Sequence, residues 1–351
     1  MKRILVLVIA GLVLIGGLSF AGGRQEAASD STRVLLYLNG TRGDQSFFDS
    51  ASRGITIAAE QFDIETRIVE GGYDSSAWQP DLAQLAGGGW DILIAGTWQL
   101  AEYVQDLAVQ YPDTTFIVYD TAVDYSAGDF SNVYSILYSQ NEGSFLAGAL
   151  AGMLTASDLD LSRSGNTIGF IGGMDIPVIN DFRVGFEQGA RQVNPNVRVL
   201  AAYVGNFNDP ARGKELALAQ IEQGADVIFA AAGESGLGAL EAAGEQGVYS
   251  IGVDSDQYLL LRDNQPNIAA SVVTSMLKNV DNSMIRAIER YLDGTLAIGQ
   301  AEVLGIREEG VGIARNENFE RIVPQAMVDE LDRLIDMIDS GEIVVETAIG
   351  E

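Results

Sequence analysis

The stretch that decides the fold is Val34-Leu35-Leu36-Tyr37-Leu38, followed by Asn39-Gly40-Thr41-Arg42-Gly43. The apolar run has the length and composition of a buried parallel strand, and the glycines after it mark a tight loop. Asp44-Gln45-Ser46-Phe47-Phe48-Asp49 then leads into a helical segment. A strand, a glycine loop and a helix start place the loop at the carboxyl end of a parallel sheet, where open α/β folds bind ligands. The candidate ligand-binding residues of this loop are Asp44, Ser46, Phe47 and Phe48.

This strand and helix pattern occurs twice along the chain, with matched landmarks. In the first half, an apolar strand begins at Asp91, and the strand after the next helix ends at Asp120, 29 positions later. In the second half, the corresponding strands run from Asp226 to Asp254, a distance of 28 positions. Alternating strands and helices predict α/β folding with parallel sheets. The duplication therefore predicts two Rossmann-like lobes whose strand-end loops face each other across a cleft.

The end of the chain is expected to cross between the lobes more than once. A strand at 267–273, a helix at 276–292 and a strand at 302–306 follow the second repeat. Several connections make a multi-strand hinge, and hinge closure around a ligand is the mechanism of periplasmic binding proteins. We assign 33–138 plus 275–305 to an N-terminal lobe and 139–274 plus 306–351 to a C-terminal lobe.

The first residues indicate an export signal. Lys2-Arg3 precede an apolar run from Ile4 to about Leu18, and small residues follow at Ser19-Phe20-Ala21. This pattern predicts a signal peptide over 1–21 that is removed, and the small polar residues of 22–32 predict a flexible tether. The alternative is a retained membrane anchor, although the run is shorter than the ~20 apolar residues that a spanning helix needs.

Composition excludes several classes of function. The chain has no cysteine and no histidine, which removes disulfides, thiol nucleophiles, Ser-His-Asp catalysis, the commonest zinc ligands and lipid attachment through a cysteine. The formal net charge of −28 repels nucleic acid and anionic lipid. We therefore expect no catalytic residue, no metal, no cofactor and no nucleic-acid partner.

Three aspartates, Asp44, Asp120 and Asp254, each follow an apolar strand at the expected cleft. They can accept hydrogen bonds from ligand hydroxyl or N–H groups; alternatively, they cap helices or turns, as aspartates at strand ends often do. Because Asp120 and Asp254 occupy matching places in the two repeats, we favour ligand binding for that pair.

Aromatic residues gather at the same face. Such rings can stack on a planar ligand, each worth about 0.5–1.5 kcal/mol beyond its buried area, or they can pack beneath the loops. We expect two of the following four to reach the cleft: Phe47, Phe48, Phe182 and Phe207. Trp98 is a weaker candidate.

Gly233 and Gly236 flank a helix start whose N–H groups can meet ligand oxygens. The sequence there is neither a Walker A loop nor a dinucleotide fingerprint, and Glu234 argues against phosphate. Lys278 is expected at a helix start, where the macrodipole disfavours a cation. It is either a solvated lysine or a group that binds ligand hydroxyls.

Several segments resemble the basic membrane protein family of substrate-binding proteins, which includes the purine-nucleoside receptor. They cover nearly the whole chain after the signal: 44–47, 142–148, 172–179, 207–214, 252–257 and 274–280. The resemblance implies a type I periplasmic-binding-protein fold that delivers nucleosides to an ABC importer. It also implies that Asp120 meets the base, that Asp254 and Lys278 hold the ribose hydroxyls, and that Phe207 stacks on the base.

Three features depart from that family. Most members carry a cysteine for lipid attachment, which this chain lacks. Phe48 stands where the family usually has Asn, and Ser52 stands where it usually has the second aromatic of the base sandwich. Phe48 or Trp98 is the candidate replacement; if neither serves, the ligand is not a purine nucleoside.

These observations together predict an exported, monomeric, two-lobed protein that captures a nucleoside and presents it to an ABC transporter permease. Two alternatives remain. One is a binding protein of the same fold for a sugar or signalling ligand, and the other is a nucleoside hydrolase that uses paired carboxylates. Calorimetry against a nucleoside panel, with analysis for reaction products, separates the three.

Overall fold

The computed structural model describes residues 31–349. The expected signal peptide, 1–21, and all but the end of the expected tether, 22–32, lie outside these residues. Thr32 corrects the tether boundary, because it belongs to strand β1 (Thr32–Leu38) and pairs with Ile64. Within the described residues, no helix is long and apolar enough to cross a membrane.

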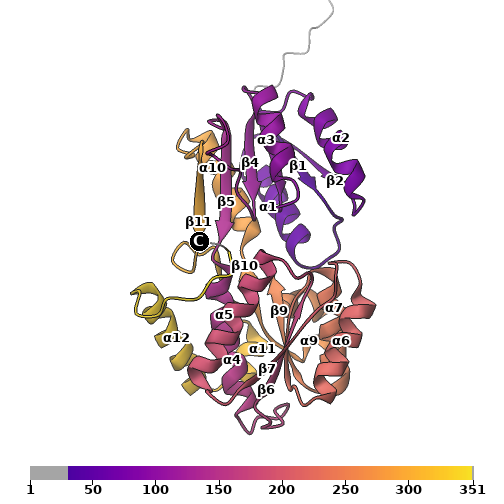
Figure 1. Ribbon diagram of the computed structural model, residues 1–351, viewed down its shortest axis with the longest axis vertical. Coiled ribbons are helices and arrows are strands. Elements are labelled where there is room, and N and C mark those ends of the chain that lie inside the picture. The colour runs from indigo at the N-terminus through magenta and orange to yellow at the C-terminus, as the bar shows by residue number, and fades with distance from the viewer. Residues whose placement is uncertain (1–30, 350–351) are drawn as a thin grey trace, which may run out of the picture. The chain divides into compact units, whose positions relative to one another are not determined.

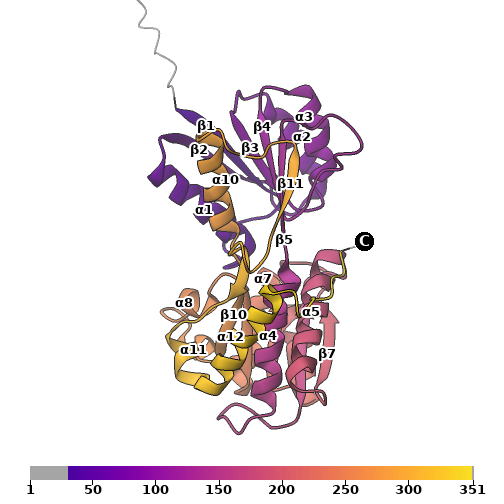
Figure 2. The same cartoon turned by 90° about the vertical axis from the view of Figure 1, so that its left-hand side faces the viewer.

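The first lobe is built on six parallel strands in the order β11-β5-β4-β3-β1-β2 (Figure 1). After β1, its strands are β2 (Ile64–Glu70), β3 (Ile92–Gly96), β4 (Thr115–Tyr119), β5 (Val133–Tyr138) and β11 (Gln300–Leu304). Its helices are α1 (Phe47–Gln61), α2 (Ser75–Ala86), α3 (Ala101–Gln110) and α10 (Val280–Leu292). Helix α10, from near the end of the chain, packs beside α1 (Figure 2).

The second lobe repeats this plan with the strand order β12-β10-β9-β8-β6-β7, in which β12 runs antiparallel to β10. Its strands are β6 (Thr167–Gly172), β7 (Arg198–Tyr203), β8 (Val227–Ala231), β9 (Tyr249–Asp254), β10 (Val272–Lys278) and β12 (Val311–Ile313). Its helices are α4 (Gln140–Thr155), α5 (Pro177–Val193), α6 (Pro210–Glu222), α7 (Glu234–Gln246), α8 (Gln257–Leu261), α9 (Pro266–Ala269), α11 (Glu317–Ile322) and α12 (Gln325–Asp339). The predicted pair of α/β lobes with parallel sheets is confirmed.

The chain passes from one sheet to the other three times: between β5 and α4, between β10 and α10, and between β11 and β12. The second passage lies after Lys278 rather than at the expected boundary before residue 275. The strand expected over 267–273 is displaced: 266–269 form helix α9, and β10 begins at Val272 and includes Thr274 and Ser275, whose buried hydroxyls have partners. The Thr274 hydroxyl donates to the Ala314 carbonyl at 2.6 Å, and the Ser275 hydroxyl accepts from the Gln257 N–H at 3.0 Å.

Successive side chains of β1 pack into two different hydrophobic clusters, one on each face of the first sheet. Val34, Leu36 and Leu38 belong to one hydrophobic cluster, whereas Leu35 and Tyr37 belong to another. Successive side chains of a strand point to opposite faces, so a strand buried on both faces is apolar at every position. All five side chains are fully buried.

Several helix pairs approach closely enough to require glycine, and two of them position the cleft. A Cβ on Gly54 of α1 would lie 2.7 Å from the Cα atom of Asp281 in α10. A Cβ on Gly148 of α4 would lie 2.0 Å from the Phe186 carbonyl oxygen of α5. These backbone contacts fix α10 to the first lobe and fix α5 within the second, and both elements carry or adjoin residues of the cleft.

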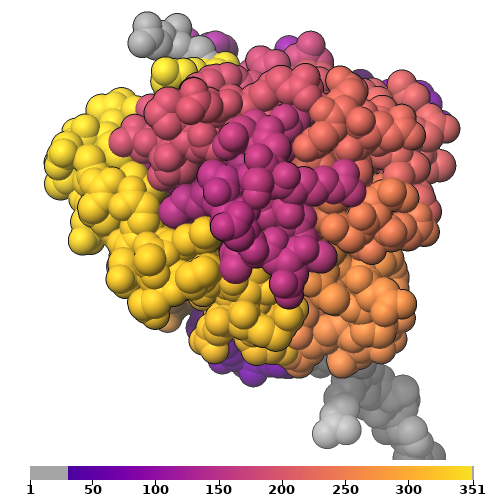
Figure 3. Space-filling view, turned by 90° about the horizontal axis from the view of Figure 1, so that it is seen from below, coloured from indigo at the N-terminus to yellow at the C-terminus, as the bar shows by residue number. Residues whose placement is uncertain are grey.

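The last part of the chain lies on the second lobe. Figure 3 shows this C-terminal part, in yellow, beside the magenta segment that includes α4, and α12 contacts α4. Beyond α12 the chain follows α5: the Gln188 side chain bonds both the Val344 carbonyl and the Glu346 N–H. The C-terminal part is thus tied to the helices that support the cleft.

Candidate ligand-binding site

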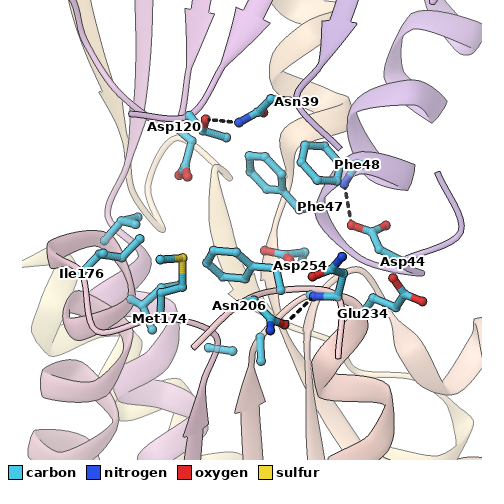
Figure 4. Close-up of a pocket in the computed structure, with 18 of the residues that line it drawn as sticks. Asn39, Asp44, Phe47, Phe48, Asp120, Met174, Ile176, Asn206, Glu234 and Asp254 are labelled. Carbon is cyan, nitrogen blue, oxygen red and sulfur yellow. Dashed lines mark hydrogen bonds between the residues drawn. The ribbon is translucent and has the colours of Figure 1, made fainter. Parts of the chain in front are cut away.

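A cavity of about 300 Å³ lies where the carboxyl ends of the two sheets meet (Figure 4). Pockets for small molecules begin at about this size and combine apolar walls with a few polar groups. Of the residues proposed from the sequence, those lining the cavity are Asp44, Phe47, Phe48, Trp98, Asp120, Phe182, Phe207, Gly233, Asp254 and Lys278. Ser46 is the exception, since it is fully buried and does not line the cavity.

Asp120 and Lys278 form an ion pair that bridges the lobes. The Lys278 Nζ atom lies 2.6 Å from Asp120 Oδ1, and the Lys278 side chain is only 2% exposed. Three rings also face this ammonium group: Phe182 at 4.8 Å, Tyr138 at 5.4 Å and Phe47 at 5.7 Å from Nζ to the ring centroid. Aromatic faces and one carboxylate replace the water that a buried ammonium has lost. Lys278 is therefore not a solvated lysine, and it ends strand β10 rather than starting a helix.

Asp254 forms the second polar contact between the lobes. Its carboxylate accepts a hydrogen bond from the Ser46 hydroxyl of the first lobe. Burial raises the pKa of Asp254 to about 6, although the Lys278 charge and the Ser46 hydroxyl act in the opposite direction. Both Asp120 and Asp254 have positive φ angles, +62° and +63°. This uncommon conformation recurs at the matching position of each lobe and turns both side chains to the cavity.

Asp44 lines the cavity, but its carboxylate is occupied by the start of helix α1. It accepts hydrogen bonds from the backbone N–H groups of Ser46 at 3.1 Å, Phe48 at 2.9 Å and Asp49 at 3.1 Å. Burial raises its pKa to about 7 despite these bonds. The capping role that the sequence left open is the one present here.

The four phenylalanines differ in how much of each ring is free. Phe48 and Phe182 are 8% and 2% exposed, and Phe48 packs against Gly40. Phe47 and Phe207 are half-buried. The Phe47 ring stacks on Tyr119 with centroids 5.4 Å apart, which leaves its other face toward the cavity (Figure 4). Of the four phenylalanines, Phe47 and Phe207, from opposite lobes, thus keep the most free surface at the cavity, which the exposed rings of Tyr73 and Trp98 also line.

Ser52 and Trp98 occupy different environments. Ser52 is buried in α1, does not line the cavity, and its hydroxyl has no hydrogen-bond partner among the described residues. Trp98 does line the cavity and is 52% exposed. An aromatic ring is therefore present at the cavity edge, although it comes from the loop after β3 rather than from α1.

The loop before α7 also reaches the cavity. Gly233 has φ +55°, and a Cβ there would lie 3.4 Å from the Phe207 carbonyl oxygen. Glycine suits this position because it alone adopts such angles without strain. Glu234 follows it and lines the cavity.

Several lining residues were not proposed as ligand contacts from the sequence. They are Asn39, Tyr73, Trp78, Thr97, Gln99, Met174, Ile176, Val178, Ile179, Gly205, Asn206, Asn208, Ala231, Ala232, Glu234 and Val253. Asn206 and Asn208 flank Phe207, and Met174 to Ile179 lie in a family motif, so position alone could have found them. Trp78 lies inside α2, where nothing in the sequence distinguishes it from an ordinary core residue.

The lobes touch through further hydrogen bonds beside the cavity. The Gln257 Nε2 atom donates to the Gln45 carbonyl at 3.1 Å, and an Arg53 guanidinium nitrogen donates to the Ser255 hydroxyl at 3.2 Å. The described residues contain no cluster of three or more carboxylates that could hold a metal. The arrangement is that of a closed cleft able to grip a small, partly planar, hydroxyl-bearing ligand.

Comparison with protein families matches residues 31–346 to the model described as "ABC transporter substrate-binding protein PnrA-like". The chain is 30% identical to basic membrane protein A2 of Borrelia garinii subsp. bavariensis, over 98% of this chain and 96% of that protein. It is also 30% identical to basic membrane protein A of Borreliella burgdorferi, over the same shares. These matches confirm the resemblance seen in the sequence motifs.

Solved structures share the fold. A solute-binding protein of an ABC transporter system from Aeropyrum pernix aligns with a TM-score of 0.79 at 24% identity, covering 90% of this chain and 94% of that one. A Caulobacter myo-inositol binding protein, solved with myo-inositol, aligns with a TM-score of 0.61 at 16% identity, covering 83% and 95%. At these identities the likeness shows the periplasmic-binding-protein fold alone.

Proposed function

Because this chain belongs to the PnrA-like family of ABC transporter substrate-binding proteins, we propose that it captures a purine nucleoside in the cleft and delivers it to an ABC importer. Proteins of this family bind a substrate and are not enzymes, which removes the hydrolase alternative. The observation that carries the nucleoside proposal is the pairing of two free rings, Phe47 and Phe207, with a polar group formed by Asp120, Asp254 and Lys278. A flat base needs aromatic rings on which to stack, and a sugar needs polar groups that bond its hydroxyls.

Each part of the ligand has a proposed set of contacts. The base lies between Phe47 and Phe207 and donates N–H groups to Asp120. The ribose hydroxyls bond Asp254 and Lys278, whose charges strengthen those hydrogen bonds. Trp98, one of the two replacements expected from the sequence, supplies at the cavity edge the aromatic ring that is missing at Ser52. Asp44 holds the α1 start in place instead of touching the ligand.

The transport context is also a proposal. Substrate-binding proteins of ABC systems work outside the cytoplasm, so we expect the chain to be exported by its first 21 residues. A monomer presenting its closed form to a permease is the expected working unit. The chain has no cysteine to carry a lipid.

Titration calorimetry with a panel of purine nucleosides, pyrimidine nucleosides, pentoses and inositol tests this function. We expect purine nucleosides to bind without being chemically converted, so chromatography should recover them intact. Asp254→Ala should weaken that binding about tenfold or more, since a hydrogen bond to a charged group is worth ~1.5–3 kcal/mol. Binding of pentoses or inositol without nucleosides would instead favour a sugar-binding protein.

A further inference from the structure

Glu234 is a cavity-lining carboxylate with no partner of its own. It is the first residue of α7 and half-buried, and its side chain makes no hydrogen bond or ion pair within residues 31–349. Its charge reaches the cleft: burial raises the pKa of the Tyr73 hydroxyl, and the nearby charges of Asp44 and Glu234 add to this rise. Figure 4 shows Glu234 on the second lobe, on the same side of the cavity as Asp44.

The position of Glu234 is one that otherwise suits an anion. The N-terminus of a helix carries partial positive charge, and a glycine loop before it lets an anionic group approach the backbone. Helix α7 has 13 residues, and Gly233 with φ +55° precedes it. In this chain a side-chain carboxylate supplies the negative charge at that helix end.

The other charged groups at the cavity offer an anion no compensation. Three further carboxyl groups line it, from Asp44, Asp120 and Asp254. Lys278 is the one cation among the described lining residues, and Asp120 already holds it at 2.6 Å. A phosphate group in the cleft would therefore be desolvated beside an unpaired carboxylate, which is strongly unfavourable.

We infer that Glu234 is a specificity-determining residue that excludes phosphorylated ligands from the cleft. The inference rests on the proposed function, because it names which members of the nucleoside class are admitted. Repulsion built against a competitor separates two ligands as effectively as attraction toward the preferred one. Glu234 thus lets the protein select nucleosides from a mixture that also contains nucleotides.

The test compares neutral and phosphorylated ligands that are otherwise the same. Titration calorimetry would use adenosine with adenosine 5′-monophosphate, and ribose with ribose 5-phosphate, on the unmodified protein, Glu234→Gln and Glu234→Ala. Glu241→Gln is the matched control, because it removes the same charge from the same helix outside the cavity, where Glu241 pairs with Lys214 at 2.9 Å. Circular dichroism checks that each variant is folded.

We expect Glu234→Gln to keep adenosine affinity within about threefold and to bind the monophosphate at least about tenfold more tightly than the unmodified protein does. Glu234→Ala should show the same two effects as Glu234→Gln. Glu241→Gln should not change the ratio of the affinities for adenosine and its monophosphate. An unchanged ratio in both Glu234 variants would overturn the inference, as would equal binding of adenosine and its monophosphate by the unmodified protein. If only ribose binds, and Glu234→Gln admits ribose 5-phosphate, the nucleoside proposal fails while the role of Glu234 stands.

Discussion

Lys278 is a buried cation that depends on a carboxylate from the opposite lobe. Lys278→Met should therefore lower the free energy of unfolding by about 3–5 kcal/mol, because it leaves the Asp120 carboxylate buried without its partner. The double variant Asp120→Asn with Lys278→Met should recover much of that loss. Chemical denaturation of the four proteins in this cycle measures the coupling, and simple additivity of the two losses would contradict the ion pair.

Two buried carboxyl groups should make the ligand-free protein less stable as pH rises. Burial raises the folded-state pKa values of Asp44 and Asp254 to about 7 and about 6, from the 3.8 that is usual for an aspartate. The folded state then binds more protons than the unfolded state between pH ~4 and ~7, so stability falls across that window, by on the order of 3 kcal/mol for Asp254. Denaturation at pH 4.5 and 7.5 should show a smaller fall in Asp254→Asn. A fall of the same size in that variant would contradict the assignment.

The sequence could find Asp120 and Asp254 because the fold is duplicated, and a matched spacing predicts a matched place in each lobe. It left the role of Asp44 open, because an aspartate after a strand serves equally well as a helix cap or a ligand contact. The sequence also could not predict the ion pair between Lys278 and Asp120. The two residues lie 158 positions apart in the chain, and only the arrangement of the two sheets brings them together.

At the level of elements, the sequence predicted a strand over 267–273 and a helix from 276, whereas β10 runs from Val272 to Lys278 and the helix begins at Val280. Thr274 and Ser275 are fully buried, which a hydrophobicity pattern does not predict. Their partners, Ala314 and Gln257, come from segments that fold against the strand, so the satisfaction of their hydrogen bonds is visible only in three dimensions. Long apolar strands such as β1 do not depend on side-chain partners from distant segments, and their hydrophobicity pattern predicted them correctly.

Helix α5 and the chain end form one supporting unit under the cleft. The buried Asp181 carboxylate accepts from Gln140 Nε2 and Thr347 Oγ1, each at 2.6 Å, and from the Ala348 N–H at 2.9 Å. Asp181 precedes Phe182, whose ring faces Lys278. The chain end is thus connected to the cavity wall through a single turn of α5.

Asp181→Ala should therefore destabilise the protein by about 2–4 kcal/mol, since the buried Gln140 amide and two partly buried donors, from Thr347 and Ala348, lose a charged acceptor. Glu187→Ala is the matched control on the same helix, where the partly exposed pairs with Arg183 and Arg191 predict a loss below about 1 kcal/mol. Thermal unfolding followed by circular dichroism compares the two. Equal losses would mean that the chain end adds nothing to α5.

For the whole molecule, affinity should depend on contacts that hold the lobes together without touching the ligand. Ser46 is such a contact, because it is buried outside the cavity and donates to Asp254 across the cleft. The Ser46–Asp254 hydrogen bond stabilises the closed form, so removing this bond should favour opening of the lobes and release of the ligand.

Ser46→Ala should raise the ligand dissociation rate about threefold to tenfold with little change in association, because a hydrogen bond to a charged group is lost only when the lobes separate. Ser50→Ala is the control. Ser50 is equally buried in α1, but it accepts from the Asp281 N–H and from an Arg53 guanidinium nitrogen, both of the same lobe. Its loss removes no direct bond between the lobes and should not speed release. Stopped-flow fluorescence, with the nucleoside proposed as the ligand, measures both rates. Similar dissociation rates in the two variants would show that the Ser46 bond does not hold the closed form.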